Sequence, residues 1–531
     1  MALCSGCTPW REYFHNGFKV GPNYRTPPAP VEQAWIDTAD RRLRTDSDDL
    51  SRWWTVFNDP VLDSLVCHAY QQNLTLREAG FRVMQARAQL GIAMGNLLPQ
   101  SQGASGSYTR YGLSQETANN ILGFGLPGVH RFYDQWTYGL NLNWELDFWG
   151  RFRRAVESNA ASLNASVNDY DDVLVTLLGD VAMNYVQLRT FEQRIAYAQS
   201  NIDLQRETLR IVEARFRANT ISALDVHQAR STLGQTEAAI AELQIDARQA
   251  ANRLCVLLGM PPEDLRARLE PRPIPVAPPE VAIGIPAGLL RRRPDVRRAE
   301  RAAAAQSAQI GIAESDLYPH IAIAGTIGYA AENFAHLNEP LAMYGAVGPQ
   351  FQWNLLNYNR IRNNVRVQDA RFRELVTAYQ QTVLMAEQEV ENGLVQFLRA
   401  QQRSQFQGTS VDEALQAVKL VLVQYQAGTV DFTRVTQLEL NLVTQQDTLA
   451  QARGEIALGL TQVYRALGGG WEIRFQGCTA SPLAPPGQVP AEAVAPPDLV
   501  PVPDLVPVPG LPAPAPPSST LPGADQFRKV E

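Results

Sequence analysis

The 531-residue sequence has no stretch of eighteen or more consecutive apolar residues, which excludes a helix that crosses a bilayer. It also has no basic excess: 47 Lys and Arg residues stand against 54 Asp and Glu, and the net charge is −7. A nucleic-acid partner would require a basic surface and is not expected. A transmembrane β-barrel is not excluded, because its strands only alternate between apolar and polar residues.

Residues that build catalytic and metal sites are few and scattered. The six histidines have no mutual spacing, and neither a glycine-rich phosphate loop nor a nucleophile elbow is present, so we expect no enzyme activity, no cofactor and no metal site. The five cysteines are odd in number and widely spaced, which argues against a disulfide framework; Cys255 is expected to be a small buried apolar residue. The arginines at 291–293 have acidic neighbours and should form a solvated face with local ion pairs.

The alternating stretch Trp136–Phe148 is the clearest structural signal. Its even positions are apolar or aromatic and its odd positions are small or polar, as in a strand with one apolar face. Thirteen residues are long for a soluble sheet and suit a tilted strand that crosses a membrane. After Gly150 the apolar residues recur at steps of three and four, which predicts a coiled-coil-like helix roughly 100 Å long.

This strand-to-helix unit occurs twice, 209 positions apart. Trp144–Arg151 corresponds to Trp353–Arg360, and Phe216–Thr220 corresponds to Tyr425–Thr429, without a change in register. The chain therefore contains two tandem repeats of one supersecondary unit, which we place at 20–270 and 287–471.

Each repeat is expected to supply two strands and two long helices. The expected strands lie at about 101–112, 136–148, 321–329 and 347–355, and the expected helices at about 152–218, 223–258, 361–427 and 430–467. Helical spacing also runs from Pro60 to about Leu98, with Asp59 as N-cap. The remaining parts are an N-terminal segment at 1–19, a proline-rich connector at 271–286 and a proline-rich tail without fixed structure at 472–531.

Four strands cannot close a barrel, and an open sheet edge in a bilayer leaves backbone groups unpaired. Two chains would give eight strands and three would give twelve, and only the larger barrel leaves an open lumen. We therefore predict a mainly α fold with a β-barrel contribution, in which strands from several copies close a membrane β-barrel and the long helices continue it as an α-barrel. Such an assembly would be a conduit.

Several short motifs carry a resemblance to a known family. They are Val20–Tyr24, Trp54–Pro60, Trp144–Arg151, Arg292–Asp295, Gly348–Trp353 and Ala466–Trp471. With these motifs, which spread over residues 20–471, the chain resembles the outer membrane efflux protein (TolC-like) family, in the lipoprotein (NodT-type) branch of resistance-nodulation-division efflux systems.

The resemblance implies a homotrimer in which four β-strands per chain complete a twelve-stranded membrane β-barrel. It also implies that this trimer spans the outer membrane and extends a helical tunnel into the periplasm. It implies partners as well, namely a periplasmic adaptor (membrane fusion) protein, an inner-membrane efflux pump and outer membrane lipid. The expected function is an exit duct for small molecules such as drugs, toxic compounds or metal ions. The alternative is a periplasmic coiled-coil adaptor or scaffold that does not span the membrane, which would explain the helices but not the alternating strands.

Two sets of residues are expected to contact the membrane. Ser5-Gly6-Cys7 resembles the end of a bacterial lipoprotein signal and implies that Cys7 is acylated; the alternative is a buried or merely reactive thiol. Aromatic residues in and beside the alternating strands are expected near the membrane interfaces, where barrels carry aromatic girdles: Tyr108, Trp136, Tyr138, Trp144 and Trp353.

The resemblance also assigns roles to the turns between the long helices. It implies that Asp225 and Tyr425 hold the periplasmic end of the tunnel closed. The acidic ring of the family is absent from the second repeat, whose positions carry Arg434 and Gln437, so an Arg434–Asp225 ion pair supported by Asp431 is expected instead. The alternative is that these are solvated turn groups. The adaptor is expected to dock at the turn residues Asn219, Thr220, Gly428 and Thr429.

Overall fold

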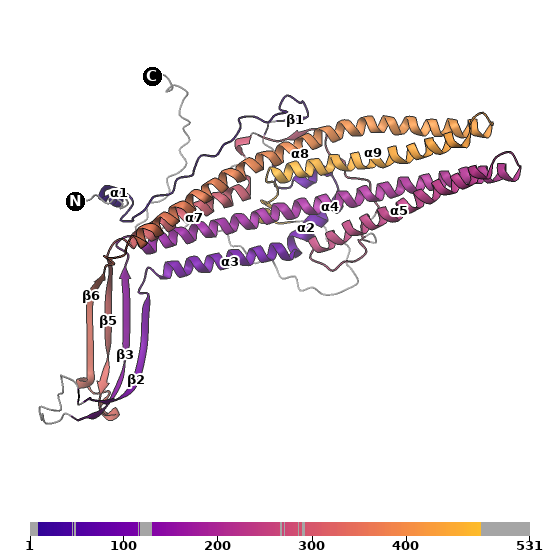
Figure 1. The fold of residues 1–531 in the computed structure, drawn as a ribbon. Helices are drawn as coiled ribbons and strands as arrows, with labels where there is room; N and C mark the ends of the chain where they lie inside the picture. The colour runs from indigo at the N-terminus through magenta and orange to yellow at the C-terminus, as the bar shows by residue number, and fades with distance from the viewer. Residues whose placement is uncertain are drawn as a thin grey trace, which may run out of the picture.

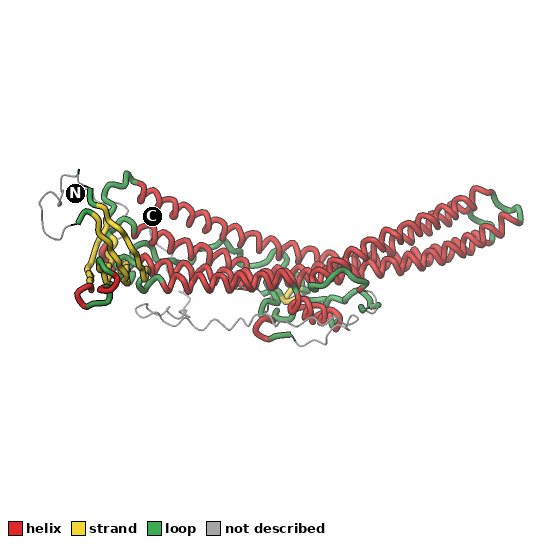
Figure 2. Tube along the Cα trace, turned by 90° about the horizontal axis from the view of Figure 1, so that it is seen from below, coloured by secondary structure: helices red, strands yellow, loops and turns green. Residues whose placement is uncertain are grey.

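The computed structural model describes residues 9–44, 46, 49–114, 116, 130–265, 268–269, 271–284, 286–288 and 292–478. The molecule is elongated, with a small sheet at one end that continues into a layer of long helices (Figure 1). Seen from below, the helices run together to a pair of turns at the opposite end (Figure 2).

Four antiparallel strands form the sheet, in the order β2–β3–β5–β6. They are β2 (Ser101–Gly112), β3 (Phe132–Leu146), β5 (His320–Ala331) and β6 (Met343–Gln352). The two repeats join at the centre, where Leu140 of β3 is paired with Ile327 of β5. Within the described parts of the chain, the edge strands β2 and β6 have no second neighbour.

The helical layer is four helices wide along its whole length. Its helices are α3 (Leu74–Gly95), α4 (Arg151–Arg217), α5 (Ala223–Leu257), α7 (Pro294–Ser315), α8 (Arg360–Gln426) and α9 (Phe432–Ala466). Contacts give the order α3–α4–α7–α8 near the sheet and α5–α4–α9–α8 beyond the middle. One edge of the layer is therefore α8, and the other is α3 followed by α5. None of the described helices has the length and apolar character needed to cross a membrane.

The expected single helix from Pro60 to Leu98 is wrong, because Asn73 divides it. The structure has α2 (Pro60–Gln72) and α3, and Asn73 between them is extended, with ψ of 126°. The Asn73 side chain accepts a hydrogen bond from the Leu76 amide at 2.8 Å and so caps α3. The predicted cap at Asp59 is confirmed, since its carboxylate accepts from the Val61 amide at 2.9 Å.

Short elements surround the middle of the layer and the junction with the sheet. They are α1 (Trp10–His15), β1 (Leu43–Arg44), η1 (Trp53–Phe57), β4 (Val281–Ala282), η4 (Pro286–Gly288), η5 (Phe334–His336), η6 (Pro340–Ala342) and α10 (Ile473–Gln476). β1 pairs in parallel with β4, which ties the chain just before η1 to the proline-rich connector.

The main hydrophobic core lies in the middle of the molecule and contains residues of both repeats. Trp53 is buried and stacks on Tyr464 of α9, with ring centroids 5.5 Å apart. Gly470 has φ of +99°, and a Cβ there would lie 2.7 Å from Leu178, so only glycine fits. This core fixes the two repeats to each other.

The structure corrects three of the sequence expectations and confirms a fourth. Residues 472–478 are ordered rather than part of a structureless tail, because Ile473 is fully buried. Cys478 forms a disulfide with Cys67 of α2, contrary to the argument from the cysteine count, with Cα atoms 5.5 Å apart. Arg293 is buried rather than solvated and donates to Asp295 and Glu389. Cys255 is buried as predicted. The tail beyond 478 lies outside the described residues.

Candidate functional site

The sheet has two chemically different faces. Residues paired across the strands share a face, so the register defines successive rows. One row consists of Ala104, Leu140, Ile327 and Gly345, and the next consists of Gly103, Asn141, Thr326 and Ala346. One face is therefore apolar, and the other carries small and polar side chains.

Aromatic residues lie at both ends of the apolar face. Trp136 contacts the Tyr108 ring at 4.5 Å at the end far from the helices. At the near end, the indole nitrogens of Trp144 and Trp353 donate to backbone carbonyl oxygens at 3.2 and 3.0 Å. Trp136 and Trp144 are eight residues apart, about 26 Å along a strand, which is close to the ~25 Å apolar band of membrane barrels. That the five predicted aromatics contact membrane interfaces stays a prediction.

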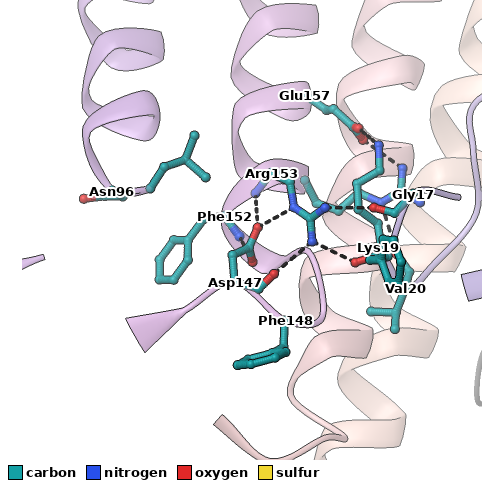
Figure 3. Close-up of polar contacts among 12 residues, drawn as sticks. Gly17, Lys19, Val20, Asn96, Asp147, Phe148, Phe152, Arg153 and Glu157 are labelled. Atoms are coloured by element: carbon teal, nitrogen blue, oxygen red, sulfur yellow. Dashed lines mark hydrogen bonds and ion pairs between the residues drawn. The ribbon is translucent and has the colours of Figure 1, made fainter. Parts of the chain in front are cut away.

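The junction between β3 and α4 is built by the motif around Asp147 (Figure 3). The Asp147 carboxylate accepts from the amides of Phe152 and Arg153, at 3.0 Å each, and thereby caps α4. It also forms an ion pair with Arg153 at 2.9 Å. Gly150 makes the turn in the left-handed region, with φ of +81°. Because Asp147 bonds to the helix, β3 ends at Leu146 rather than at Phe148.

The N-terminal segment is bound to this junction. Arg153 donates to the carbonyl oxygens of Gly17 and Phe18, at 2.8 Å each (Figure 3). The Tyr13 hydroxyl donates to the carbonyl oxygen of Phe148 at 2.7 Å, and Lys19 forms an ion pair with Glu157. Sequence reasoning missed these contacts. Their one signal was the adjacent pair Arg153 and Arg154, shortly after Gly150. Cys7 lies outside the described residues.

The two turns at the far end of the helices are built alike. Asn219 and Gly428 occupy the left-handed region, with φ of +55° and +75°. The following residues, Thr220 and Thr429, each donate their amide and hydroxyl to the carbonyl oxygen five residues earlier, at 2.9–3.1 Å. The repeat register therefore extends to individual hydrogen bonds. Docking of an adaptor at these four residues stays a prediction.

The expected Arg434–Asp225 ion pair is absent from the described chain. Arg434 is exposed and donates instead to Gln437, one turn further along α9, at 3.4 Å. Asp431 is the N-cap of α9 and accepts from the Arg434 amide at 3.0 Å. Asp431, Arg434 and Gln437 therefore form a local group within one helix turn.

Tyr425 and Asp225 come close together without a hydrogen bond. Tyr425 is buried against the Phe432 ring at 5.5 Å, and its hydroxyl has no hydrogen-bond partner among the described residues. Burial raises the pKa of Tyr425, the charge of Arg215 opposes this rise, and the charge of Asp225 adds to it. A buried hydroxyl without a hydrogen-bond partner costs free energy, so the Tyr425 ring, rather than its hydroxyl, makes the stabilising contacts here.

Arg215 makes the contact at this end that sequence reasoning missed. Its guanidinium donates to the carbonyl oxygen of Tyr425 and lies 4.7 Å from the centre of the Tyr425 ring. The last turn of α4 is thereby joined to the last turn of α8 by a charged hydrogen bond and a cation–π contact. An arginine in the last turn of a long helix was the available signal.

Arg215 is the last member of a polar series along α4, which we call the polar seam. Its members occur at multiples of seven residues, the heptad position where coiled coils usually carry apolar residues. The contacts in order are Asp180 with Arg465 (3.1 Å), Arg194 with Asp447 (2.6 Å), Asn201 with Gln446 (2.7 Å), Thr208 with Glu439 (2.6 Å) and Arg215 with the Tyr425 carbonyl oxygen. The α4–α5 hairpin thus meets the α8–α9 hairpin through polar contacts as well as through apolar residues such as Val212 and Val435.

Glu439 is the most buried carboxylate of the polar seam. It is 3% exposed, and the Thr208 hydroxyl donates to it. Burial raises the pKa of Glu439 above its ordinary value of 4.5, and the hydrogen bond from Thr208 opposes this rise. The proton on Glu439 therefore affects how strongly the two hairpins bind each other.

Comparison with known proteins identifies a family and relatives that match this chain. The family described as "Outer membrane efflux protein" matches residues 65–260 and 285–469, one segment in each repeat. Nodulation protein T of Rhizobium leguminosarum bv. trifolii is 30% identical, over 87% of this chain and 97% of that protein. The pyoverdine export outer membrane protein OpmQ of Pseudomonas aeruginosa is also 30% identical, over 85% and 94%.

Solved structures of outer-membrane channels have a similar fold. The outer-membrane channel OprN is 33% identical, with a TM-score of 0.78 over 85% of this chain and 99% of that one. The open state of the MtrE outer membrane channel of Neisseria gonorrhoeae is 25% identical, with a TM-score of 0.71 over 85% and 98%. The match covers both repeats, the sheet and the helical layer, and the chain belongs to the outer membrane efflux protein family.

Proposed function

We propose that three copies of this chain form the outer membrane exit duct of a tripartite efflux system. In this proposal a twelve-stranded β-barrel crosses the membrane, and an α-helical tunnel extends through the periplasm to an adaptor protein and an inner-membrane pump. The open sheet carries the proposal: it has one apolar face, one face of small and polar residues, and two edge strands that lack a second neighbour in the described chain.

Closure follows from the unpaired edges. Pairing of β6 of one copy with β2 of the next is a head-to-tail contact, and such contacts generate a closed ring when the rotation between copies closes. Two copies would give an eight-stranded barrel filled by its own side chains, whereas three copies leave a lumen. The face of small and polar residues would line that lumen, and the apolar face would contact lipid.

Exposed apolar residues on the two edges of the helical layer support the same ring. Large apolar side chains exposed on a soluble surface indicate an interaction surface. On α8 they include Val367, Leu384, Phe406 and Leu420, and on α3 and α5 they include Phe81, Met84, Ile92 and Ile245. Contact between α8 of one copy and α3 and α5 of the next would bury both sets.

The remaining parts of the proposal concern location and cargo. The Cys67–Cys478 disulfide suits the oxidising periplasm. Acylation of Cys7 would add a lipid anchor, and labelling with a palmitate analogue should mark the wild-type chain but not Cys7→Ser. Relatives are named for export of pyoverdine, toluene and cations. Because one architecture serves such different cargo, we propose that the duct passes small molecules without selecting them.

Conductance in planar lipid bilayers tests the proposed function. The purified full-length chain should produce discrete current steps. Asp225→Ala combined with Tyr425→Phe should raise the conductance, because we propose that these two residues help to close the periplasmic end of the tunnel. Asp203→Ala, which removes an exposed carboxylate from α4, serves as the control. No current steps from either the wild type or the gate variant would contradict the duct.

A further inference from the structure

Three aromatic side chains at the start of the described chain point into solvent. Trp10, Phe14 and Phe18 are 69%, 57% and 53% exposed. Their rings surround the buried Tyr13 ring, with centroid distances of 5.8, 5.6 and 5.7 Å. We call Trp10, Phe14 and Phe18 the aromatic triplet. Such a cluster on a surface indicates a partner that would cover it.

The chain holds the aromatic triplet in place by specific contacts. Phe18 has φ of +62°, a conformation that is unfavourable for a residue with a bulky side chain. The carbonyl oxygens of Gly17 and Phe18 accept from Arg153, and the Tyr13 hydroxyl donates to the Phe148 carbonyl oxygen. The exposure of the triplet is therefore fixed by contacts with the β3–α4 junction rather than by an unattached chain end.

These contacts also set the level of the triplet along the molecule. α1 lies beside the place where the strands give way to the helices (Figure 1). The Trp10 ring is 6.4 Å from Trp149, which follows β3 directly. The triplet is thus next to the end of the sheet that carries Trp144 and Trp353, which the proposed function places at the periplasmic interface of the membrane.

We propose that the aromatic triplet is a lipid-contacting anchor that inserts into the headgroup layer of the inner leaflet of the membrane that the sheet crosses. Aromatic rings concentrate at this level of a bilayer, and a short helix with one apolar side lies in the interface plane. The inference rests on the proposed function, because the sheet must be in the membrane. It does not require acylation of Cys7, and it makes the N-terminal segment a second attachment to the bilayer.

A nitroxide label on α1 tests the anchor. Cys4→Ser, Cys7→Ser and Phe14→Cys leave position 14 as the reactive thiol, since Cys255 is buried and Cys67 is joined to Cys478. The full chain is reconstituted into vesicles of phosphatidylethanolamine and phosphatidylglycerol. Electron paramagnetic resonance then compares collisions with oxygen, which concentrates in the bilayer, and with a nickel chelate, which stays in water.

The matched control is a label at Glu12, on the opposite side of the same helix. Labels at Leu140 of β3 and Leu224 of α5, both exposed in the chain, give the lipid and water references. We expect the ratio of oxygen to nickel collisions at Phe14 to be several-fold higher than at Glu12 and to lie between the ratios at Leu224 and Leu140, because the headgroup layer lies between water and the middle of the bilayer.

A ratio at Phe14 close to that at Leu224 would overturn the anchor. Shielding of Phe14 from both reagents would overturn it too, because a protein surface rather than lipid would then cover the triplet. Failure of the proposed function is distinguishable: the Leu140 label would itself behave as a water-exposed site. A lipid-like Leu140 label with a water-like Phe14 label rejects the anchor alone.

Discussion

Arg215 is the single residue whose removal should most directly loosen the far end of the helices. It joins α4 to the Tyr425 backbone and ring, and a hydrogen bond that involves a charged group contributes about 1.5–3 kcal/mol. Arg215→Ala should therefore increase the conductance or the open fraction in planar bilayers.

Arg217→Ala is the matched control, because within the described parts of the chain the Arg217 guanidinium bonds along its own helix, to the Glu213 carbonyl oxygen. This variant should conduct like the wild type. Equal traces from Arg215→Ala and the wild type would show that the α4–α8 contact does not limit the opening.

The Cys67–Cys478 disulfide gives a second prediction at the residue scale. The cross-link spans a sequence separation of 411 residues and fixes the segment after α10 to α2. Removing a native disulfide typically costs 2–4 kcal/mol, so Cys67→Ser with Cys478→Ser should lower the thermal midpoint by several degrees. A reductant should lower the wild-type midpoint similarly and leave the double variant unchanged. If the wild type does not respond to reductant, the cross-link does not stabilise the fold.

Residue types alone could not reveal these contacts. The argument from the cysteine count treats all five thiols alike, whereas the disulfide forms because the fold brings Cys67 and Cys478 together. The prediction for the arginines at 291–293 used only their acidic neighbours in the sequence. Arg293 is instead buried, and it donates a hydrogen bond to the carbonyl oxygen of Ala466, far away in the sequence, at 2.8 Å. Both errors concern long-range packing.

At the scale of elements, the polar seam yields a prediction about pH. Glu439 has a raised pKa in the folded chain, so the folded state holds its proton more tightly than the unfolded state. The contribution of the protonated Glu439 to the free energy of unfolding is therefore fully present below about pH 4.5, and it is lost as the pH rises through the raised pKa. A pKa difference of one corresponds to about 1.4 kcal/mol.

Glu439→Gln should remove this part of the pH dependence, because glutamine keeps an acceptor for Thr208 without a charge. Thermal midpoints recorded between pH 4.5 and 8 should fall with rising pH more steeply for the wild type than for this variant. Glu242→Gln, an exposed change of the same kind on α5, should behave like the wild type. Parallel curves for all three proteins would show that Glu439 does not contribute to the pH dependence of stability.

Element type was predictable because it depends on local periodicity. Alternation indicated β3, and the change of period after Gly150 indicated α4. Boundaries depended on single side chains instead. Asp147 ends β3 by capping α4, and Asn73 divides a continuous apolar pattern into α2 and α3. Polar side chains that bond to the backbone decide such points, and their effect is not visible in hydrophobic spacing.

At the scale of the whole molecule, the two repeats give one chain an open sheet and an open helical layer. The repeat register was readable from the sequence and holds in the turns at Thr220 and Thr429. How the open edges are covered depends on neighbouring chains, so a single sequence indicates only that covering is needed. A coiled-coil adaptor that never enters a membrane would have no use for such a sheet.

Native mass spectrometry of the protein extracted from membranes in detergent decides whether the chain forms the proposed trimer. We expect a particle with three times the chain mass measured under denaturing conditions, because three copies would close the sheet into twelve strands. A particle that stays a monomer or a dimer at concentrations where it conducts in bilayers would rule out the proposed duct, since neither can form an open barrel from this sheet.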